Sequence, residues 1–176
     1  KNVFDVIFIG EAEESYQRFL NLFFNFKEKS KILEEASKIN GIYVPSYSKT
    51  YNRAFYPNFS LDFSKSIFNT KLGEFGDCKL IELTRGCPAK CKFCISRVLY
   101  NPVRFADKEL IKDIINDTEC KKIGLLGASV SYHPNIKEIM DFILKKGKSF
   151  SISSLKADRL DKDFVKLLFL GGSRTI

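Results

Sequence analysis

The stretch Lys79-Leu-Ile-Glu-Leu-Thr-Arg-Gly-Cys-Pro-Ala-Lys-Cys-Lys-Phe-Cys94 joins a short apolar run to a loop that carries three cysteines. Residues 79–83 are predicted to form a buried strand, because they form a short run of mainly apolar residues that ends near a glycine. The loop places Cys87, Cys91 and Cys94 within eight residues, separated by three and then by two residues. This spacing allows one loop to direct three thiolates to a common point.

The three cysteines are better suited to an iron–sulfur cluster with one open position than to a closed metal site. A structural zinc site and a ferredoxin-type cluster each take four protein ligands, and the loop supplies three. An external ligand would then complete the coordination. The chain has two further cysteines, Cys78 and Cys120, which are isolated and are expected to be buried core residues. The total of five is odd, which argues against a disulfide framework.

The run Glu82-Leu-Thr-Arg-Gly-Cys-Pro-Ala-Lys-Cys-Lys-Phe-Cys94 resembles the Cys-x3-Cys-x2-Cys signature of radical S-adenosylmethionine (SAM) enzymes. Over its full length it is similar to the subgroup with an N-terminal cobalamin-binding domain. The resemblance implies that Cys87, Cys91 and Cys94 hold a 4Fe–4S cluster whose open iron binds SAM. It also implies reductive cleavage of SAM to a 5'-deoxyadenosyl radical, which takes a hydrogen atom from a substrate. Phe93 would lie near the adenine.

The second half of the chain alternates short apolar segments with segments of helical periodicity. The expected strands are residues 79–83, 122–126, 149–153 and 174–176, and the expected helices are residues 107–116, 135–144 and 161–170. Alternation of this kind predicts an α/β fold of parallel βαβ units with right-handed crossovers. The resemblance implies that residues 77–176 form the N-terminal part of a partial TIM-type (βα) barrel.

Active groups in such a sheet gather at the carboxyl ends of the strands, so three loops are expected to line one mouth. They are the cysteine loop, the segment 127–133 and the segment 153–156. The candidate cofactor-binding residues are Phe93, Arg104, Gly127, Ala128, Ser129 and Ser153, and no residue is assigned a catalytic role. Many relatives have Gly-Gly-Glu where this chain has Gly127-Ala128-Ser129, so backbone carbonyls or Ser129 would take the place of that glutamate.

Three polar residues near these loops have two readings each. Arg85 and Arg104 fit either a carboxylate of bound SAM or an ordinary salt bridge. His133 is the one histidine of the chain. It is expected to be a surface or capping residue, and its titration range also suits proton transfer.

Residues 1–45 are predicted to be the end of a Rossmann-like cobalamin-binding domain. A strand at residues 3–9, covered on both faces, would lead through Gly10-Glu-Ala-Glu-Glu14 into a helix with apolar residues from 16 to 24. A second helix is expected at residues 31–40. Acidic residues at a helix start also favour its dipole without any cofactor. The Asp-x-His-x-x-Gly element that would bind cobalt is not in this chain, so cobalamin is implied only for the parent protein.

Residues 46–76 lack sustained periodicity and are predicted to be a linker strap whose aromatic residues pack on neighbouring structure. No methionine opens the chain. We therefore expect a segment of a longer protein that is inactive in isolation. No signal peptide or run of ~18 apolar residues is present, which favours a cytoplasmic protein without a membrane partner.

The net charge of +8 is spread over scattered lysines, which favours solvated helix faces over a nucleic-acid surface. A nonenzymatic zinc or iron–sulfur module that binds nucleic acid remains an alternative, and so does a methylthiotransferase. The second alternative normally has three more cysteines upstream, and only Cys78 precedes the motif. The enzyme reading also implies a reductant such as flavodoxin or ferredoxin and a substrate that the residues do not identify.

Overall fold

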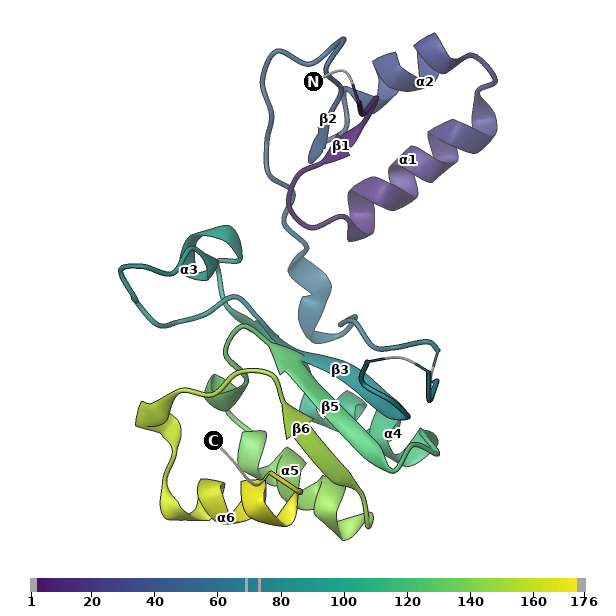
Figure 1. Cartoon of the computed structure of the whole chain (residues 1–176). Coiled ribbons are helices and arrows are strands. Elements are labelled where there is room, and N and C mark those ends of the chain that lie inside the picture. Colours follow the sequence, from purple (N-terminus) through teal and green to yellow (C-terminus); the bar gives the residue numbers. More distant parts are fainter. Residues whose placement is uncertain (1–2, 69, 73, 174–176) are drawn as a thin grey trace. The chain divides into compact units, whose positions relative to one another are not determined.

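The computed structural model describes residues 3–68, 70–72 and 74–173. The chain divides into two compact units, Lys1–Pro57 and Asn58–Ile176 (Figure 1). Residues 46–57 of the expected strap belong to the first unit and residues 58–76 to the second. The division into segments 1–45, 46–76 and 77–176 stays a prediction.

The first unit contains two helices and a two-stranded antiparallel sheet. Its elements are β1 (Ile7–Phe8), α1 (Glu13–Asn25), α2 (Lys29–Ala36) and β2 (Ile42–Tyr43). Its core contains Ala36, Ile42 and Val44, and Phe8 and Phe19 are among the half-buried residues that pack against it. The two rings meet edge to face with centroids 5.7 Å apart. Both expected helices are therefore confirmed, with bounds shifted by a few residues.

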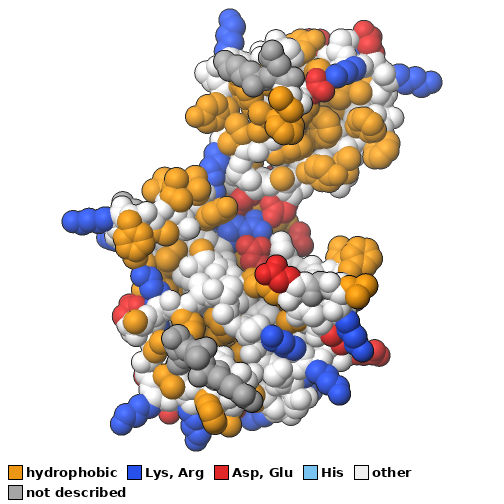
Figure 2. Space-filling model, in the orientation of Figure 1, with side chains coloured by type: hydrophobic (Ala, Val, Ile, Leu, Met, Phe, Trp, Pro, Cys, Tyr) orange, Lys and Arg blue, Asp and Glu red, His pale blue; other side chains and the backbone are white. Residues whose placement is uncertain are grey.

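The expected strand at residues 3–9 was wrong in its length and surroundings. Only Ile7 and Phe8 form β1, which pairs antiparallel with β2, and Val3 is 83% exposed. The apolar run was read as a strand of a parallel sheet, but in the described residues β1 has a single strand as its neighbour. β1 has no second neighbouring strand among the described residues and is not covered by helices on both faces. Apolar side chains of this run, such as Val3, Phe4 and Ile7, are therefore accessible to solvent. Figure 2 shows hydrophobic side chains over much of the visible face of this unit.

The second unit contains a four-stranded sheet in the order β4-β3-β5-β6. Its strands are β3 (Cys78–Arg85), β4 (Arg104–Phe105), β5 (Lys122–Gly127) and β6 (Ser149–Ile152). Its α-helices are α3 (Ser96–Leu99), α4 (Lys108–Asp117), α5 (Ile136–Lys145) and α6 (Lys162–Leu170). The described residues also form the short 3₁₀ helices η2 (Val130–Tyr132) and η3 (Ala157–Arg159) of this unit, and η1 (Pro57–Ser60), which begins at the last residue of the first unit.

Strands β3, β5 and β6 are parallel and α4, α5 and α6 follow them in turn, as the alternating sequence predicted. The core includes Ile81 and Leu125 of the sheet and Ile115, Met140 and Leu168 of the helices, all buried. The α/β fold with parallel strands is thus confirmed. The four strands do not close into a barrel within the part of the chain that the structure describes. The strand expected at residues 174–176 lies outside the described residues.

The outer edge of β3 is covered by two short segments that the sequence pattern did not predict as strands. Strand β4 pairs antiparallel with Thr84 and Arg85. Further along the edge, the Ser66 amide donates to the Leu80 carbonyl oxygen (2.9 Å) and the Glu82 amide to that of Ser64 (2.8 Å). The expected strap therefore covers the sheet edge, where unpaired backbone groups would otherwise be exposed.

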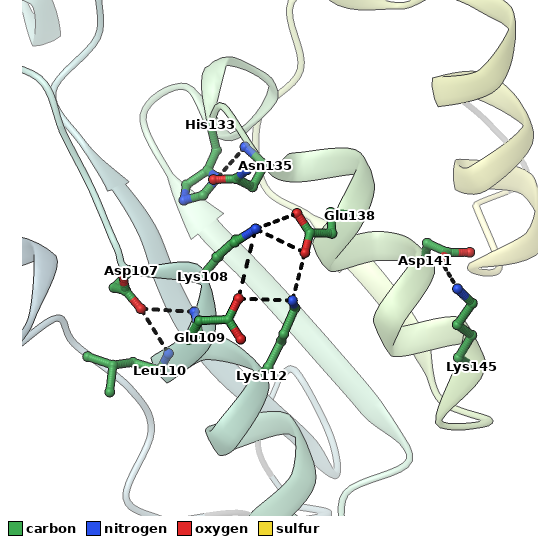
Figure 3. Close-up of polar contacts among 10 residues, drawn as sticks. All are labelled: Asp107, Lys108, Glu109, Leu110, Lys112, His133, Asn135, Glu138, Asp141 and Lys145. Carbon is green, nitrogen blue, oxygen red and sulfur yellow. Dashed lines mark hydrogen bonds and ion pairs between the residues drawn. The ribbon is translucent and has the colours of Figure 1, made fainter.

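Helices α4 and α5 are joined by a network of ion pairs (Figure 3). The Glu138 carboxylate of α5 accepts from Nζ of Lys108 (2.9 Å) and of Lys112 (2.7 Å), both on α4. Asp107 caps α4 by accepting from the amides of Glu109 and Leu110. The lysines of this network thus lie on helix faces, as expected, and are paired with acids there. Within the described ranges, no helix has the length and apolar character needed to cross a membrane.

Candidate functional site

The cysteine loop (residues 86–95) leaves the carboxyl end of β3 and leads into α3. It starts at Gly86, whose φ of +86° favours glycine and whose added Cβ would lie 3.0 Å from Cα of Val103. Cys87, Cys91 and Cys94 are all half-buried on this loop and are not in disulfides, and the Cys94 amide donates to the Cys91 carbonyl oxygen (3.3 Å). Figure 1 shows the loop and α3 projecting from the sheet.

The donor chemistry of the loop fits an iron–sulfur cluster, although the thiols are not already assembled around one point. Among the described residues, no three His, Cys, Asp or Glu side chains form a group that could hold a metal ion. Three cysteines outside disulfides on one ten-residue loop are nevertheless the type of ligand that such clusters use. Metal sites commonly assemble only with the metal, because the ligands are not preorganised without it. The assignment of these cysteines as ligands stays a prediction.

Lys156 connects the cysteine loop to the segment that follows β6. Its Nζ lies 3.1 Å from Sγ of Cys91, at hydrogen-bond distance. This contact with the Cys91 sulfur raises the pKa of Lys156 above its ordinary value. Lys156 lies in the segment expected to line the mouth, but no role was predicted for it, because its sequence neighbours do not indicate a contact with a loop 65 residues earlier.

The ends of β3, β5 and β6 form a second part of the site, which we call the strand-end platform: Thr84, Gly127, Ser129, Ser153 and Ser154. The Gly127 amide donates to Oγ of Ser153 (3.2 Å), and Oγ of Ser154 donates to the Gly127 carbonyl oxygen (2.7 Å). The Ser129 amide donates to Oγ1 of Thr84 (3.3 Å). Three of the predicted cofactor-binding residues, Gly127, Ser129 and Ser153, are therefore brought together here.

Gly127 cannot carry a larger side chain in this arrangement. Its φ is +151°, and an added Cβ would lie 2.6 Å from the carbonyl oxygen of Thr84. Ser129 is 1% exposed, and its Oγ donates to the carbonyl oxygen of Gly86 (3.1 Å), which ties the platform to the start of the cysteine loop. Ala128 lies between them and is exposed. The platform is therefore tightly packed on its buried side, and residues 127, 128 and 153 are accessible to solvent on the other side.

The two expected loops after β5 and β6 do contact each other, as predicted. The Val130 amide donates to Oγ of Ser154 (3.3 Å), and the Lys156 amide donates to Oγ of Ser131 (3.0 Å). Beside them is a pocket of about 580 Å³ at the starts of α5 and α6. Tyr132 lines this pocket under the Arg159 guanidinium, 4.4 Å from the ring centroid. This pocket was not predicted from the sequence, because its lining comes from two segments that are distant along the chain.

Phe93 and Arg104, two of the other predicted cofactor-binding residues, lie on the cysteine loop and on β4. The Phe93 side chain is 93% exposed on the cysteine loop. Arg104 is on β4, where its Nε donates to the Pro102 carbonyl oxygen (3.1 Å) and its guanidinium lies 5.8 Å from the Phe59 ring centroid.

Arg85 forms a salt bridge, which is one of the two interpretations that the sequence allowed. Its Nε and Nη2 donate to the two carboxylate oxygens of Glu82 at 3.0 and 2.8 Å. Its guanidinium also lies 4.7 Å from the centroid of the Phe59 ring. A buried guanidinium held on both sides in this way fixes the end of β3 below the cysteine loop.

His133 is buried, so the expectation of a surface position was wrong; as a capping residue it ends η2, and its side chain does not cap α5. The side chain is 2% exposed. Nδ1 accepts from the Asn135 amide (3.2 Å) at the start of α5, and Nε2 lies 2.9 Å from the carbonyl oxygen of Ala106 (Figure 3). These partners require the neutral ring with hydrogen on Nε2. Burial lowers the pKa of His133 below its ordinary value.

Both isolated cysteines are buried, as predicted, and burial raises the pKa of Cys78.

In the first unit, Glu11 of the predicted cobalamin loop is also buried. Its carboxylate accepts from the Tyr56 amide (2.7 Å), and its backbone amide donates to the Ala54 carbonyl oxygen (3.1 Å). Glu11 thus attaches residues 54–56 to the end of β1, which is a structural role.

Comparisons with known proteins agree with this geometry. A protein of Methanocaldococcus jannaschii named only as uncharacterized is 28% identical over 171 residues, which are 94% of this chain and 36% of the relative. The chain therefore spans little more than a third of that relative's length. No solved structure matches the chain significantly. Residues 81–173 match the Radical SAM superfamily, and this match includes the last five residues of β3, the cysteine loop and the strand-end platform. Because it covers more than half of the 176 residues, the chain belongs to the Radical SAM superfamily.

Proposed function

We propose that this chain is part of a radical SAM enzyme in which Cys87, Cys91 and Cys94 hold a 4Fe–4S cluster above the strand-end platform. Membership of the superfamily implies the cluster and SAM as cofactors. The observation that supports the ligand assignment best is that all three thiols lie on the loop that leaves β3 at the carboxyl edge of the parallel sheet. When bound, the cluster would supply the electron for reductive cleavage of SAM.

The strand-end platform is proposed to receive the methionine part of SAM. Ala128 and Ser153 are exposed and Gly127 is half-buried, so a ligand has access to this side of the platform. The Gly127 backbone and the Ser153 hydroxyl are bonded to each other, and a ligand would have to replace or add to these hydrogen bonds. Ser129 is buried and donates to Gly86, which supports a role in fixing the floor. Arg104 is proposed to attract the carboxylate, because it is a cation on the strand beside β3.

Phe93 is proposed to pack on the adenine of SAM. Its exposed ring supports this proposal, because an aromatic face that is open to solvent can stack on a base. We further propose, from the resemblance of the sequence around Gly10 and the cysteine loop, that the parent protein contains a cobalamin-binding domain and a partial (βα) barrel. Flavodoxin or ferredoxin is the proposed source of electrons, and the substrate is unassigned.

Anaerobic reconstitution of the whole chain with iron and sulfide tests the proposal. We expect a 4Fe–4S absorption spectrum and a paramagnetic signal after reduction, and we expect SAM to change that signal. A triple variant with Cys87→Ala, Cys91→Ala and Cys94→Ala should hold no iron, whereas Cys120→Ala is the matched control and should retain it. One tightly held zinc per chain together with salt-sensitive oligonucleotide binding would instead support the nonenzymatic module.

A further inference from the structure

Within the part of the chain that the structure describes, Lys156 forms a hydrogen bond to a sulfur of the cysteine loop from the segment that follows β6. Its Nζ lies 3.1 Å from Sγ of Cys91. Its backbone amide is anchored to the buried hydroxyl of Ser131 (3.0 Å), which lies in the loop after β5. The contact therefore joins all three loops at the carboxyl edge of the sheet.

Lys156 differs in its position in the fold from the lysines that are next to Cys91 in the sequence. Lys90 and Lys92 flank Cys91 on the cysteine loop itself, and both are exposed. Because both belong to the loop, a contact of either ammonium with the Cys91 sulfur would not link the loop to the sheet. Lys156 follows β6 and is attached to the platform side, so its ammonium can hold the middle of the loop in place.

The chemistry of this contact suits a metal–sulfur site. An ammonium group attracts a thiolate and donates hydrogen bonds to sulfur, and it cannot compete as a metal ligand while it is protonated. Groups that bind a metal ligand from outside orient that ligand, and removing them typically weakens metal binding. Hydrogen bonds and positive charge near cluster sulfurs also favour the reduced state.

We propose that Lys156 is a positioning residue for the cluster, which holds the Cys91 sulfur over the carboxyl ends of β5 and β6 and donates a hydrogen bond to it. This inference rests on the proposed function, because it concerns a cluster held by Cys91. Loss of the ammonium should make the loop release iron more readily. It should also move the one-electron reduction potential of the cluster to a more negative value.

The test compares Lys156→Met with Lys156→Arg, which keeps the charge, and with Lys92→Met, which removes a charge from the loop itself. Each full chain is reconstituted anaerobically, and iron release to a chelator and the reduction potential are measured. We expect Lys156→Met to release iron about 10- to 100-fold faster than the wild type. Its potential should be more negative, whereas Lys156→Arg and Lys92→Met should stay close to the wild type.

The outcomes separate the inference from the function on which it rests. A wild-type chain that assembles no cluster overturns the proposed function. A wild type that assembles one, with Lys156→Met equal to it in both release rate and potential, overturns the inference alone.

A second measurement avoids any dependence on the folding of the variant. Phthalaldehyde joins an amine and a thiol that lie close together into a fluorescent isoindole, and peptide mapping locates the link. In the wild-type chain without metal we expect a link between Lys156 and Cys91. Links from Cys91 to Lys90 or Lys92 alone would overturn the contact.

Discussion

The strand-end platform and the cysteine loop lie next to each other in the chain's fold, but they are held by different forces. The platform rests on buried side chains and is closed by hydrogen bonds such as that from Ser129 to Gly86. The loop has half-buried thiols, and apolar residues on and beside it, including Phe93 and Val98, are exposed. The difference suggests that packing builds the floor of the site, whereas a bound ligand is needed to fix the loop.

The largest test of this difference compares a core residue under the platform with an exposed residue of the loop. Leu125 is fully buried in β5, the strand between β3 and β6. Leu125→Ala should lower the free energy of unfolding by about 2–5 kcal/mol, because it leaves a cavity in the core. Phe93→Ala should change it by less than about 0.5 kcal/mol. Urea unfolding followed by circular dichroism measures both, and equal effects would contradict the comparison.

A smaller effect is expected where the platform meets the loop. Ser129→Ala removes the donor to the Gly86 carbonyl oxygen in a buried place, which should cost about 1–3 kcal/mol of unfolding free energy. The matched control is Ser153→Ala, since Ser153 also contacts a glycine of this region but is exposed. It should cost clearly less, because water can replace the lost hydroxyl. The urea midpoints of the two variants, measured in parallel, test this prediction, and equal midpoints would contradict it.

The pH dependence of stability reports on the buried ring of His133. The folded-state pKa lies below the ordinary value of 6.5, mainly because of burial, so the unfolded chain takes up the proton first as the pH falls. The free energy of unfolding should therefore decrease below about pH 6.5, by no more than about 1.4 kcal/mol per pH unit for one proton. His133→Gln removes this proton uptake, and its stability should vary less between about pH 7 and about pH 5. An unchanged slope would show that other groups cause the dependence.

Much of the second unit was predictable because each element has a local signal. The strands β3, β5 and β6 are short apolar runs and the helices have apolar residues at helical spacing, and both patterns depend only on neighbours in the sequence. The place of the cysteine loop followed from the parallel topology. The prediction that Gly127, Ser129 and Ser153 lie in one place followed from the same rule.

The features that were missed depend on contacts between distant residues. Strand β4 has only two residues and exists because it pairs with the end of β3, so no periodicity reveals it. The buried ring of His133 contacts the carbonyl oxygen of Ala106, and the Lys156 ammonium contacts the Cys91 sulfur, in each case far along the sequence. The prediction of a strand at residues 3–9 was wrong because an apolar pattern shows which residues are suited to burial. It does not show whether another element covers them.

The smallest effect is expected at the surface network between α4 and α5, far from the loop. Hydrogen bonds from Lys112 and then Lys108 lower the pKa of Glu138 to about 2. Its contribution is therefore present above pH 4.5, the ordinary value, and is lost as the pH falls towards about 2.

Because its side chain is 44% exposed and water screens the charges, Glu138→Gln should lower the urea midpoint less than Ser129→Ala does. The difference from the wild type should disappear in about 1 M salt. Asp141→Asn, which removes a single pair with Lys145 on the same helix, is the matched control and should have a still smaller effect. A loss at Glu138 that persists in high salt would mean that packing of the side chain, and not its charge, joins the two helices behind the platform.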